Sequence, residues 1–180
     1  MIYTYKEVIE LYKSDYKLKK AIDDKKIYKI QKGLYSDKSF VNELVIICKK
    51  YPNSIITMDS AFYYYGLTDV IPQKIYLNSV RDTSKIKNRA IVQTFLDRDV
   101  INQGKVALKV DDGIINIYNK ERLLVELIRK KNKIPFDYYK EIISNYREIK
   151  EELDMYNIEE YVCLFRNSNS LFEIIQREVF

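Results

Sequence analysis

The stretch IITMDSAFYYYGLTDVIPQKIYL, residues 55–77, is the most apolar and aromatic part of the chain. Within it, Thr57 can cap a short helix over residues 58–65, and Gly66 can end that helix in a left-handed conformation. A proline then precedes an alternating apolar pattern that predicts a strand over residues 74–77. We therefore expect a buried helix-turn-strand core, with the rest of the chain organised around it.

The composition narrows the functions that the chain can have. Its 180 residues can bury a core without help from disulfides or metals, and the absence of histidine excludes histidine-based catalysis. Cys48 and Cys163 lie far apart in apolar helical surroundings, so we expect buried thiols in a cytoplasmic protein. No uncharged apolar run approaches the roughly 20 residues that span a bilayer, so we expect no membrane insertion.

Positive charge is concentrated in two blocks of the chain. The net charge is +5, to which residues 1–38 contribute +4 and residues 71–109 contribute +5, while residues 120–180 are nearly neutral. An anionic partner would therefore meet the first half of the chain if the two blocks share a face. The second block contains a possible second basic patch: Arg81, Lys85, Lys87 and Arg89.

The first residues contain two short helical segments. Residues 4–7, TYKE, form a capping box that predicts a first helix over residues 5–13. Ser14 or Asp15 can cap a second helix over residues 16–25, which turns its apolar residues inward at helical spacing. The outward face of this second helix carries three candidate DNA-binding residues and its flank a fourth: Tyr16, Lys19, Lys20 and, on the flank, Lys17.

A basic hairpin follows these two helices. Residues 27–30 and 34–36 predict two short strands, and Gly33 supplies the turn between them. The pattern is typical of a winged helix-turn-helix, in which a helix enters the major groove and the hairpin, or wing, reaches flanking phosphates. The candidate wing residues are Lys29, Gln31 and Lys32. A lysine-rich face that is merely solvated is the alternative interpretation, and the sequence leaves it open.

Residues 1–38 contain ten lysines and no arginine. Bidentate recognition of guanine by arginine is therefore not available to this segment, and specificity would have to come from other side chains or from DNA shape. Lysine contacts to phosphate release counterions, so we expect DNA binding to weaken strongly as salt rises.

The expected fold class is α+β, with three parts. Residues 1–38 form the winged helix-turn-helix, residues 39–53 a connecting helix that begins at Ser39, and residues 54–180 a C-terminal α+β domain. That domain should hold a small, mostly antiparallel sheet and then a helical bundle. Its expected strands cover residues 74–78, 90–95, 105–110 and 114–118, with a turn at Asp111-Asp112-Gly113, and its helices begin at Asn119, Pro135, Asn157 and Ser170.

Asp97-Arg98-Asp99 is the one pattern that suggests metal chemistry. It follows a predicted strand, and paired carboxylates hold divalent ions in nucleotidyltransferases. No glycine-serine turn that could hold a triphosphate lies before Asp97, and the common nucleotide, zinc and protease motifs are missing from the sequence. We therefore expect no catalytic residue, no metal site and no cofactor. Asp59 and Ser60, which look catalytic in isolation, are better explained by capping and buried hydrogen bonding.

Three short motifs in the central stretch resemble the centre of the AbiEi antitoxin family in their order and spacing. They are residues 60–62 (SAF), 66–69 (GLTD) and 75–77 (IYL), and residues 32–35 (KGLY) and 121–123 (ERL) extend the resemblance over the whole chain. AbiEi-type proteins are antitoxins of type IV toxin-antitoxin, or abortive infection, systems that act in phage defence. Their toxin is a nucleotidyltransferase-like enzyme.

The resemblance implies two activities. The N-terminal winged helix would bind inverted repeats in the promoter of the protein's own operon and repress it, and the larger C-terminal domain would counteract the toxin. Type IV behaviour needs no stable complex, so direct contact with the toxin stays open. The resemblance also implies that Tyr16, Lys17, Lys19 and Lys20 take the recognition-helix positions and that Lys29, Gln31 and Lys32 form the wing. The chain holds lysine where arginine is often found in the recognition helix.

The second basic patch could extend the DNA path or serve neutralisation. We expect a monomer on DNA, because no exposed heptad seam is present. Two other functions stay open: a metal-dependent nucleotide-handling enzyme using Asp97 and Asp99, and a DNA-binding accessory factor without a toxin partner.

Overall fold

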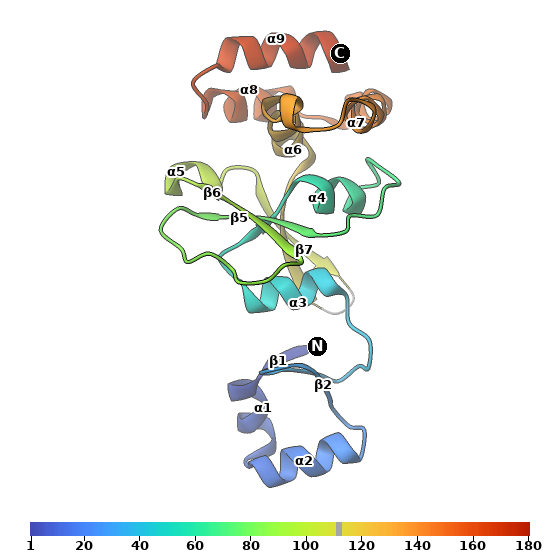
Figure 1. Ribbon diagram of the computed structural model, residues 1–180, viewed down its shortest axis with the longest axis vertical. Coiled ribbons are helices and arrows are strands. Elements are labelled where there is room, and N and C mark those ends of the chain that lie inside the picture. Colours follow the sequence, from blue (N-terminus) through green and yellow to red (C-terminus); the bar gives the residue numbers. More distant parts are fainter. Residues whose placement is uncertain (111–112) are drawn as a thin grey trace. The chain divides into compact units, whose positions relative to one another are not determined.

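The computed structural model describes residues 1–110 and 113–180 (Figure 1). The fold is α+β, and the chain divides into two compact units. The first unit is Met1–Pro52 with Leu108–Ile115, and the second is Asn53–Ala107 with Asn116–Phe180. The predicted turn residues Asp111 and Asp112 lie outside the described residues.

The first unit combines a three-stranded antiparallel sheet with helices. Its elements are, in chain order, β1 (Ile2–Thr4), α1 (Tyr5–Tyr12), α2 (Asp15–Asp23), β2 (Tyr28–Gln31), β3 (Leu34–Ser36) and α3 (Glu43–Lys50). β3 lies between β1 and β2, so that both Ile2 and Tyr28 are paired with Ser36. The sequence analysis missed β1, because three residues are too few to show an alternating pattern.

Local capping fixes where α1 and α2 begin. The predicted capping box is confirmed: the Thr4 amide donates to Glu7 Oε2 at 2.6 Å, and the Glu7 amide donates to Thr4 Oγ1 at 3.4 Å. Ser14, and not Asp15, caps α2, because its hydroxyl accepts from the amide of Lys17 at 3.3 Å. Between these helices Lys13 adopts a left-handed conformation with φ 66°.

The two helices and the sheet share one small core. It consists of Val8, Leu18, Ala21, Ile27 and Tyr35, all at most 6% exposed. Tyr3, Ile9, Tyr12 and Ile22 pack against this core from its edges. Because Leu18 and Ala21 face inward, the rotation of α2 about its axis is set by burial.

The third predicted helix starts later than expected. α3 begins at Glu43, whereas the sequence analysis placed its start at Ser39. The side chain of Asn42 accepts from the Leu44 amide at 2.9 Å and so caps the helix at that point. Phe40 therefore lies before the helix and is 82% exposed.

The second unit contains most of a five-stranded sheet and the C-terminal helices. The elements from residue 55 onward are β4 (Ile55–Ile56), α4 (Met58–Tyr64), β5 (Ile75–Val80), β6 (Ile91–Leu96), α5 (Arg98–Ile101), β7 (Lys105–Val110), β8 (Gly113–Tyr118), α6 (Lys120–Arg129), α7 (Phe136–Glu148), α8 (Met155–Cys163) and α9 (Ser168–Val179). The outer halves of β7 and β8 belong to the first unit. Figure 1 shows α6, α7, α8 and α9 gathered into a helical bundle.

The larger sheet is mixed, so the expectation of a mostly antiparallel sheet is wrong. Its strand order is β6-β5-β4-β8-β7. β5 runs antiparallel to β4 but parallel to β6, and β4 runs parallel to β8. The loop of residues 81–90 returns the chain to the end of the sheet at which β5 began. β6 therefore starts beside the start of β5 and runs parallel to it.

The central stretch forms the expected helix-turn-strand core. Gly66 follows α4 with φ 67°, as predicted, and the Thr57 amide donates to Tyr76 O at 3.0 Å. The hydroxyl of Ser60 donates to Lys74 O at 3.3 Å and accepts from the Tyr76 amide at 3.0 Å. These bonds tie α4 to β5 and confirm a hydrogen-bonding role for Ser60. Thr57 occupies the N-cap position, but its buried hydroxyl makes no capping bond.

The segment after Gly66 is held by α7. Glu141 Oε1 accepts from the Thr68 hydroxyl at 2.7 Å and from the Asp69 amide at 3.3 Å. The side-chain amide of Asn145 donates to Leu67 O at 3.0 Å. One helix therefore satisfies polar groups of a turn in which Leu67 and Thr68 are buried and Asp69 is exposed.

Two of the four predicted helix starts in the C-terminal part are confirmed. Asn119 caps α6 by accepting from the Arg122 amide at 3.0 Å, and α7 begins directly after Pro135. α8 begins at Met155 instead of Asn157, because the Asp154 carboxylate accepts from the amides of its first turn. α9 begins at Ser168 instead of Ser170.

Two further findings concern the cysteines and the helices as a group. Cys48 is buried as expected, but Cys163, at the end of α8, is exposed. Of the helices within residues 1–110 and 113–180, none has the length and apolar character needed to cross a membrane.

The glycines yield a testable comparison. Gly66 and Gly104 both have positive φ, of 67° and 76°, but a Cβ on Gly66 would meet nothing within 4 Å, whereas one on Gly104 would lie 2.5 Å from Arg122 Cβ. We expect Gly66→Ala to lower the free energy of unfolding by about 1–2 kcal/mol through left-handed strain alone. Gly104→Ala adds a clash and should cost about 2–5 kcal/mol. Urea denaturation measures both, and equal losses would contradict the crowding at Gly104.

Candidate functional site

The exposed face of α2 carries the predicted recognition residues. Burial of Leu18 and Ala21 turns the opposite side of the helix to solvent, where Tyr16 is 78% exposed. Three lysines accompany it, all exposed and without an ion pair in the part of the chain that the structure describes: Lys17, Lys19 and Lys20. α2 also carries two exposed carboxylates, Asp15 and Asp23, but neither forms an ion pair with these lysines in the described residues.

The tip of the β2–β3 hairpin lies beside the start of α1. Gly33, with φ 81°, accepts at its carbonyl from the Tyr5 amide at 2.9 Å. Lys29 and Lys32 are exposed, but Gln31 is half-buried, and its Oε1 accepts from Lys50 Nζ at 3.4 Å. The predicted wing residues therefore lie on one hairpin, and a lysine of α3 joins them.

Lys50 is a basic residue beside the β2–β3 hairpin that was not predicted from the sequence. It lies 19 residues beyond Gln31, at the end of α3, and no local pattern in the sequence connects the two residues. Its neighbour Lys49 has a different role, because Lys49 Nζ pairs with Glu7 Oε1 at 2.8 Å. The Lys49 bond, together with the Thr4 amide, lowers the pKa of Glu7 to about 2. Lys49 is thus neutralised, whereas Lys50 adds to the positive charge at the β2–β3 hairpin.

The second basic patch is divided between two places in the second unit. Lys85, Lys87 and Arg89 are exposed in the loop between β5 and β6. Arg81 instead forms an ion pair with Asp97, Nη1 to Oδ1 at 3.4 Å. Asp99 lies in the first turn of α5 and is exposed. Within residues 1–110 and 113–180, no three His, Cys, Asp or Glu side chains are grouped so as to hold a metal ion.

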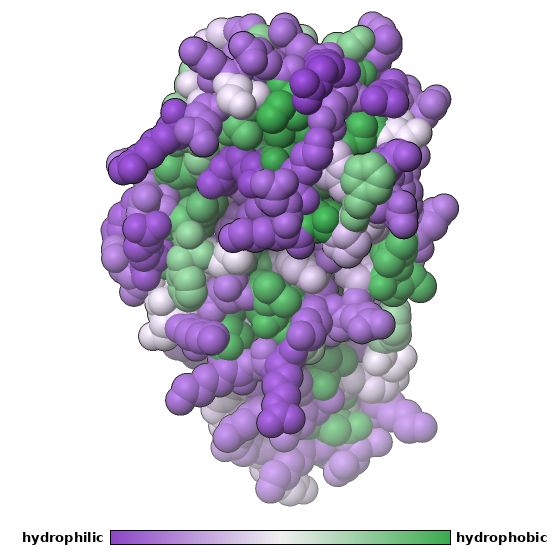
Figure 2. Space-filling view, turned by 45° about the horizontal axis from the view of Figure 1, so that its top comes forward, coloured by the Kyte–Doolittle hydropathy of each residue, from purple (hydrophilic) through white to green (hydrophobic). Residues whose placement is uncertain are grey.

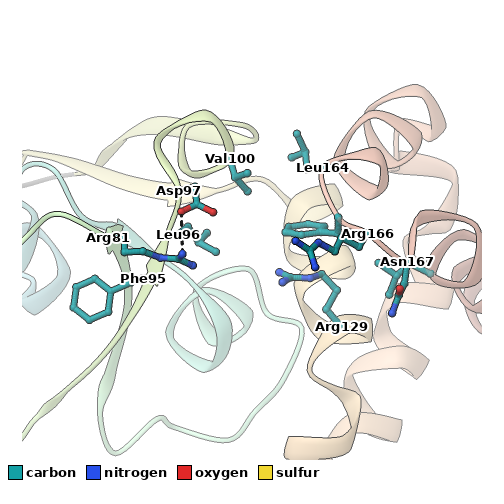
Figure 3. Close-up of a pocket in the computed structure, with 11 residues that line it drawn as sticks. Arg81, Phe95, Leu96, Asp97, Val100, Arg129, Leu164, Arg166 and Asn167 are labelled. Atoms are coloured by element: carbon teal, nitrogen blue, oxygen red, sulfur yellow. Dashed lines mark ion pairs between the residues drawn. The ribbon is translucent and has the colours of Figure 1, made fainter.

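A pocket of about 570 Å³ opens beside the Arg81–Asp97 pair. Its walls come from the ends of β5 and β6, from α5 and α6, and from the loop between α8 and α9 (Figure 3). Three arginines line it: Arg81, Arg129 and Arg166. In Figure 3 the guanidinium of Arg81 points across the pocket toward those of Arg129 and Arg166. We refer to it as the arginine pocket.

Behind the arginine pocket lies a buried carboxylate with three cationic neighbours. Glu126 is fully buried, and its oxygens lie 3.0 Å from Arg122 Nη2, 3.0 Å from Arg129 Nη1 and 3.5 Å from Lys130 Nζ. One negative charge therefore faces three positive ones. Burial lowers the pKa of Arg129 and of Lys130, which reflects the cost of holding these cations away from water. We call these four residues the Glu126 cluster.

Arg122 is the most deeply buried member of the Glu126 cluster. It is 0% exposed, and neither its Nε nor its Nη1 has a hydrogen-bond partner. The aromatic ring of Tyr118 lies 5.0 Å from its Cζ, and that of Phe165 lies at the same distance on the pocket side. Phe165 also stacks on Arg129, with 3.4 Å between Cζ and the ring centroid. One aromatic residue thus connects the buried cluster to the pocket.

The sequence analysis did not find the arginine pocket. In the sequence, Arg129 and Lys130 are typical of the cations that favour a helix C-terminus, and nothing singles out Arg166. One signal for the Glu126 cluster was present in the sequence. Arg122, Glu126 and Lys130 are spaced four residues apart, which places them on one face of an otherwise apolar helix. The contribution of Arg81 and Arg166 depends on tertiary contacts that no local pattern shows.

Most of the surface in view in Figure 2 is hydrophilic, and apolar side chains occur in small groups. The exposed large apolar residues of the second unit include Ile71, at 70%, and Phe136, at 67%. Exposed apolar residues of this kind are normal on protein surfaces and by themselves indicate no interface.

The Glu126 cluster predicts a strong response to charge removal. Glu126→Gln keeps the shape of the side chain but leaves buried cations without a counter-charge, so we expect a loss of about 3–5 kcal/mol in the free energy of unfolding. Glu173→Gln on the exposed side of α9 is the control, with an expected change below about 0.5 kcal/mol. Denaturant titration of both variants measures the difference, and equal stabilities would contradict the burial of an ionised Glu126.

The chain was also compared with known proteins. No family model matches it, and no curated protein matches it significantly. A function must therefore be inferred from its own side chains and from the motifs that resemble the AbiEi family.

Proposed function

We propose that the chain is a regulator that binds double-stranded DNA through α2 and the β2–β3 hairpin. The observation that carries the proposal is the row of Lys17, Lys19 and Lys20 on α2, all exposed and without an ion pair among the described residues. Side chains of this kind are free to meet phosphate oxygens, and each contact displaces a condensed counterion from the DNA.

The arrangement of the first unit supports a winged helix-turn-helix. α1 and α2 pack on a shared core, α2 is the second helix, and a two-stranded hairpin follows it. In such a module α2 enters the major groove and the hairpin contacts the flanking backbone. Tyr16 is then the candidate for base contact, and Lys29, Lys32 and Lys50 are the candidates for phosphate contact. Gln31 positions the wing, since its oxygen is held by Lys50.

The DNA experiment compares the sequence upstream of the chain's own gene with a shuffled duplex at two salt concentrations. We expect tighter binding to the native sequence and weaker binding at higher salt. The triple variant Lys19→Ala, Lys20→Ala, Lys32→Ala should bind at least about tenfold more weakly, and its slope of log K against log salt should be smaller by about 2–3.

A matched control removes the same charge from the second unit. Lys74→Ala, Lys133→Ala, Lys140→Ala changes three exposed lysines, and its DNA affinity and salt slope should stay close to those of the unchanged protein. Circular dichroism confirms that both triple variants are folded. If the two variants lose affinity equally, net charge and not the α2 face accounts for binding.

The wider role that we propose is that of an AbiEi-type antitoxin and autorepressor, active in the cytoplasm and without catalytic activity of its own. This part rests on the resemblance. Its supporting observation is that residues 66–69 and 121–123 hold the second unit together, through Glu141, Asn145 and the buried Arg122. These two motifs of the resemblance thus occupy structural positions in the proposed neutralising domain.

Co-expression tests the antitoxin role separately from DNA binding. The chain should restore growth to cells that express a nucleotidyltransferase-like toxin encoded beside it. The Lys19, Lys20 and Lys32 triple variant should restore growth equally well while it fails to repress the operon promoter in a reporter assay. If the chain binds the promoter but gives no protection, it is a DNA-binding accessory factor without an antitoxin role.

A further inference from the structure

We propose that the arginine pocket binds the phosphate groups of a small phosphorylated ligand, with diphosphates and triphosphates as the best match in charge. The pocket belongs to the second unit and shares no residue with α2 or the hairpin. The inference therefore goes beyond DNA binding and stands or falls independently of it.

The first argument is the convergence of arginines from separate segments. Arg81 follows β5, Arg129 ends α6, and Arg166 lies in the loop between α8 and α9. These segments are far apart in the sequence, yet all three side chains reach toward one space (Figure 3). Guanidinium groups repel one another when they share a site, so their convergence is favourable when an anion lies between them.

The second argument is the charge balance. Among the pocket residues, Arg81, Arg129 and Arg166 are opposed by Asp97 alone. The Glu126 cluster behind them has two further cations and one carboxylate. The pocket and the cluster together therefore hold an excess of three positive charges in the absence of a ligand. A carboxylate ligand would offset one of these charges, whereas a diphosphate or triphosphate offsets most or all of them.

The third argument is that hydrogen-bond donors are available. Arg166 is exposed, and no ion pair is found for it in residues 1–110 and 113–180. Arg81 forms one ion pair, with Asp97 at 3.4 Å, which leaves other N–H groups of its guanidinium available as donors. Asn167 adds an amide beside Arg166 in the pocket wall. Arginine forks match phosphate oxygens in a bidentate manner, so these donors are suited to a phosphoryl group.

The shape of the site favours a small ligand over a nucleic-acid strand. The volume of about 570 Å³ lies within the range of small-molecule sites. A duplex spreads its charges along an axis, with one negative charge per about 1.7 Å, and proteins meet it with a row of cations. Arginines that converge on one space instead match a compact group of high charge.

Calorimetric titration of the full chain tests the proposal, with pyrophosphate, ADP and ATP as probes at constant ionic strength. Arg166→Ala and Arg81→Ala each remove one guanidinium from the pocket and leave the Glu126 cluster intact. Either change should weaken binding of the best probe by about tenfold or more, because a charge-assisted hydrogen bond is lost. Arg177→Ala is the matched control, since Arg177 is 73% exposed on α9 and does not line the pocket.

Each outcome decides the question. Binding that falls in Arg166→Ala and Arg81→Ala but not in Arg177→Ala supports the site. Absence of binding for all three probes at millimolar concentration overturns it, as does an equal loss in all three variants. A duplex is added as competitor to distinguish the two sources of phosphate. If the duplex displaces the probe, and the pocket variants lose DNA affinity as well, nucleic-acid backbone is the ligand and the small-molecule proposal is wrong.

Discussion

A buried carboxylate with three cationic neighbours constrains the second unit more than any other interaction. Glu126 cannot be ionised in the interior without partners, and it has Arg122, Arg129 and Lys130 around it. Arg122 in turn needs space, which Gly104 provides, because any side chain at that position would overlap Arg122. The Gly104 carbonyl also accepts from the amide of Asn119, the residue that caps α6. The start of the helix and the burial of its charges are thus one arrangement.

Arginine is confined to one of the two units, whereas lysine occurs in both. The first unit contains lysine and no arginine, whereas every arginine of the chain belongs to the second. A lysine ammonium on a flexible stem accommodates phosphates in many positions, and an arginine fork fixes the orientation of its partner. The lysines of the first unit therefore match the proposed contact with a DNA backbone, and the arginines of the second match the proposed phosphate site.

Local signals in the sequence predicted the parts of the fold that local interactions determine. The capping box at Thr4 and Glu7, the left-handed Gly66 and the starts of α6 and α7 are each decided within a few residues. The parallel pairing of β5 with β6 was not predictable in this way, because it depends on how a ten-residue loop returns the chain. For the same reason the lysines of α2 could be chosen from helical spacing, whereas Lys50 and the arginine pocket are visible only in the tertiary structure.

The composition of the first unit has a consequence for synthesis on the ribosome. Its core of Val8, Leu18, Ala21, Ile27 and Tyr35 lies within the first 36 residues, so it can form early. α3, in contrast, packs against a segment that is synthesised much later. The backbone of Gly113 lies against Val45, and a Cβ on Gly113 would be 2.8 Å from Val45 Cγ1. More than sixty residues separate these two positions, so α3 emerges long before its partner does. During that interval the nascent chain exposes one apolar side of α3, and a chaperone that shields it would favour correct folding.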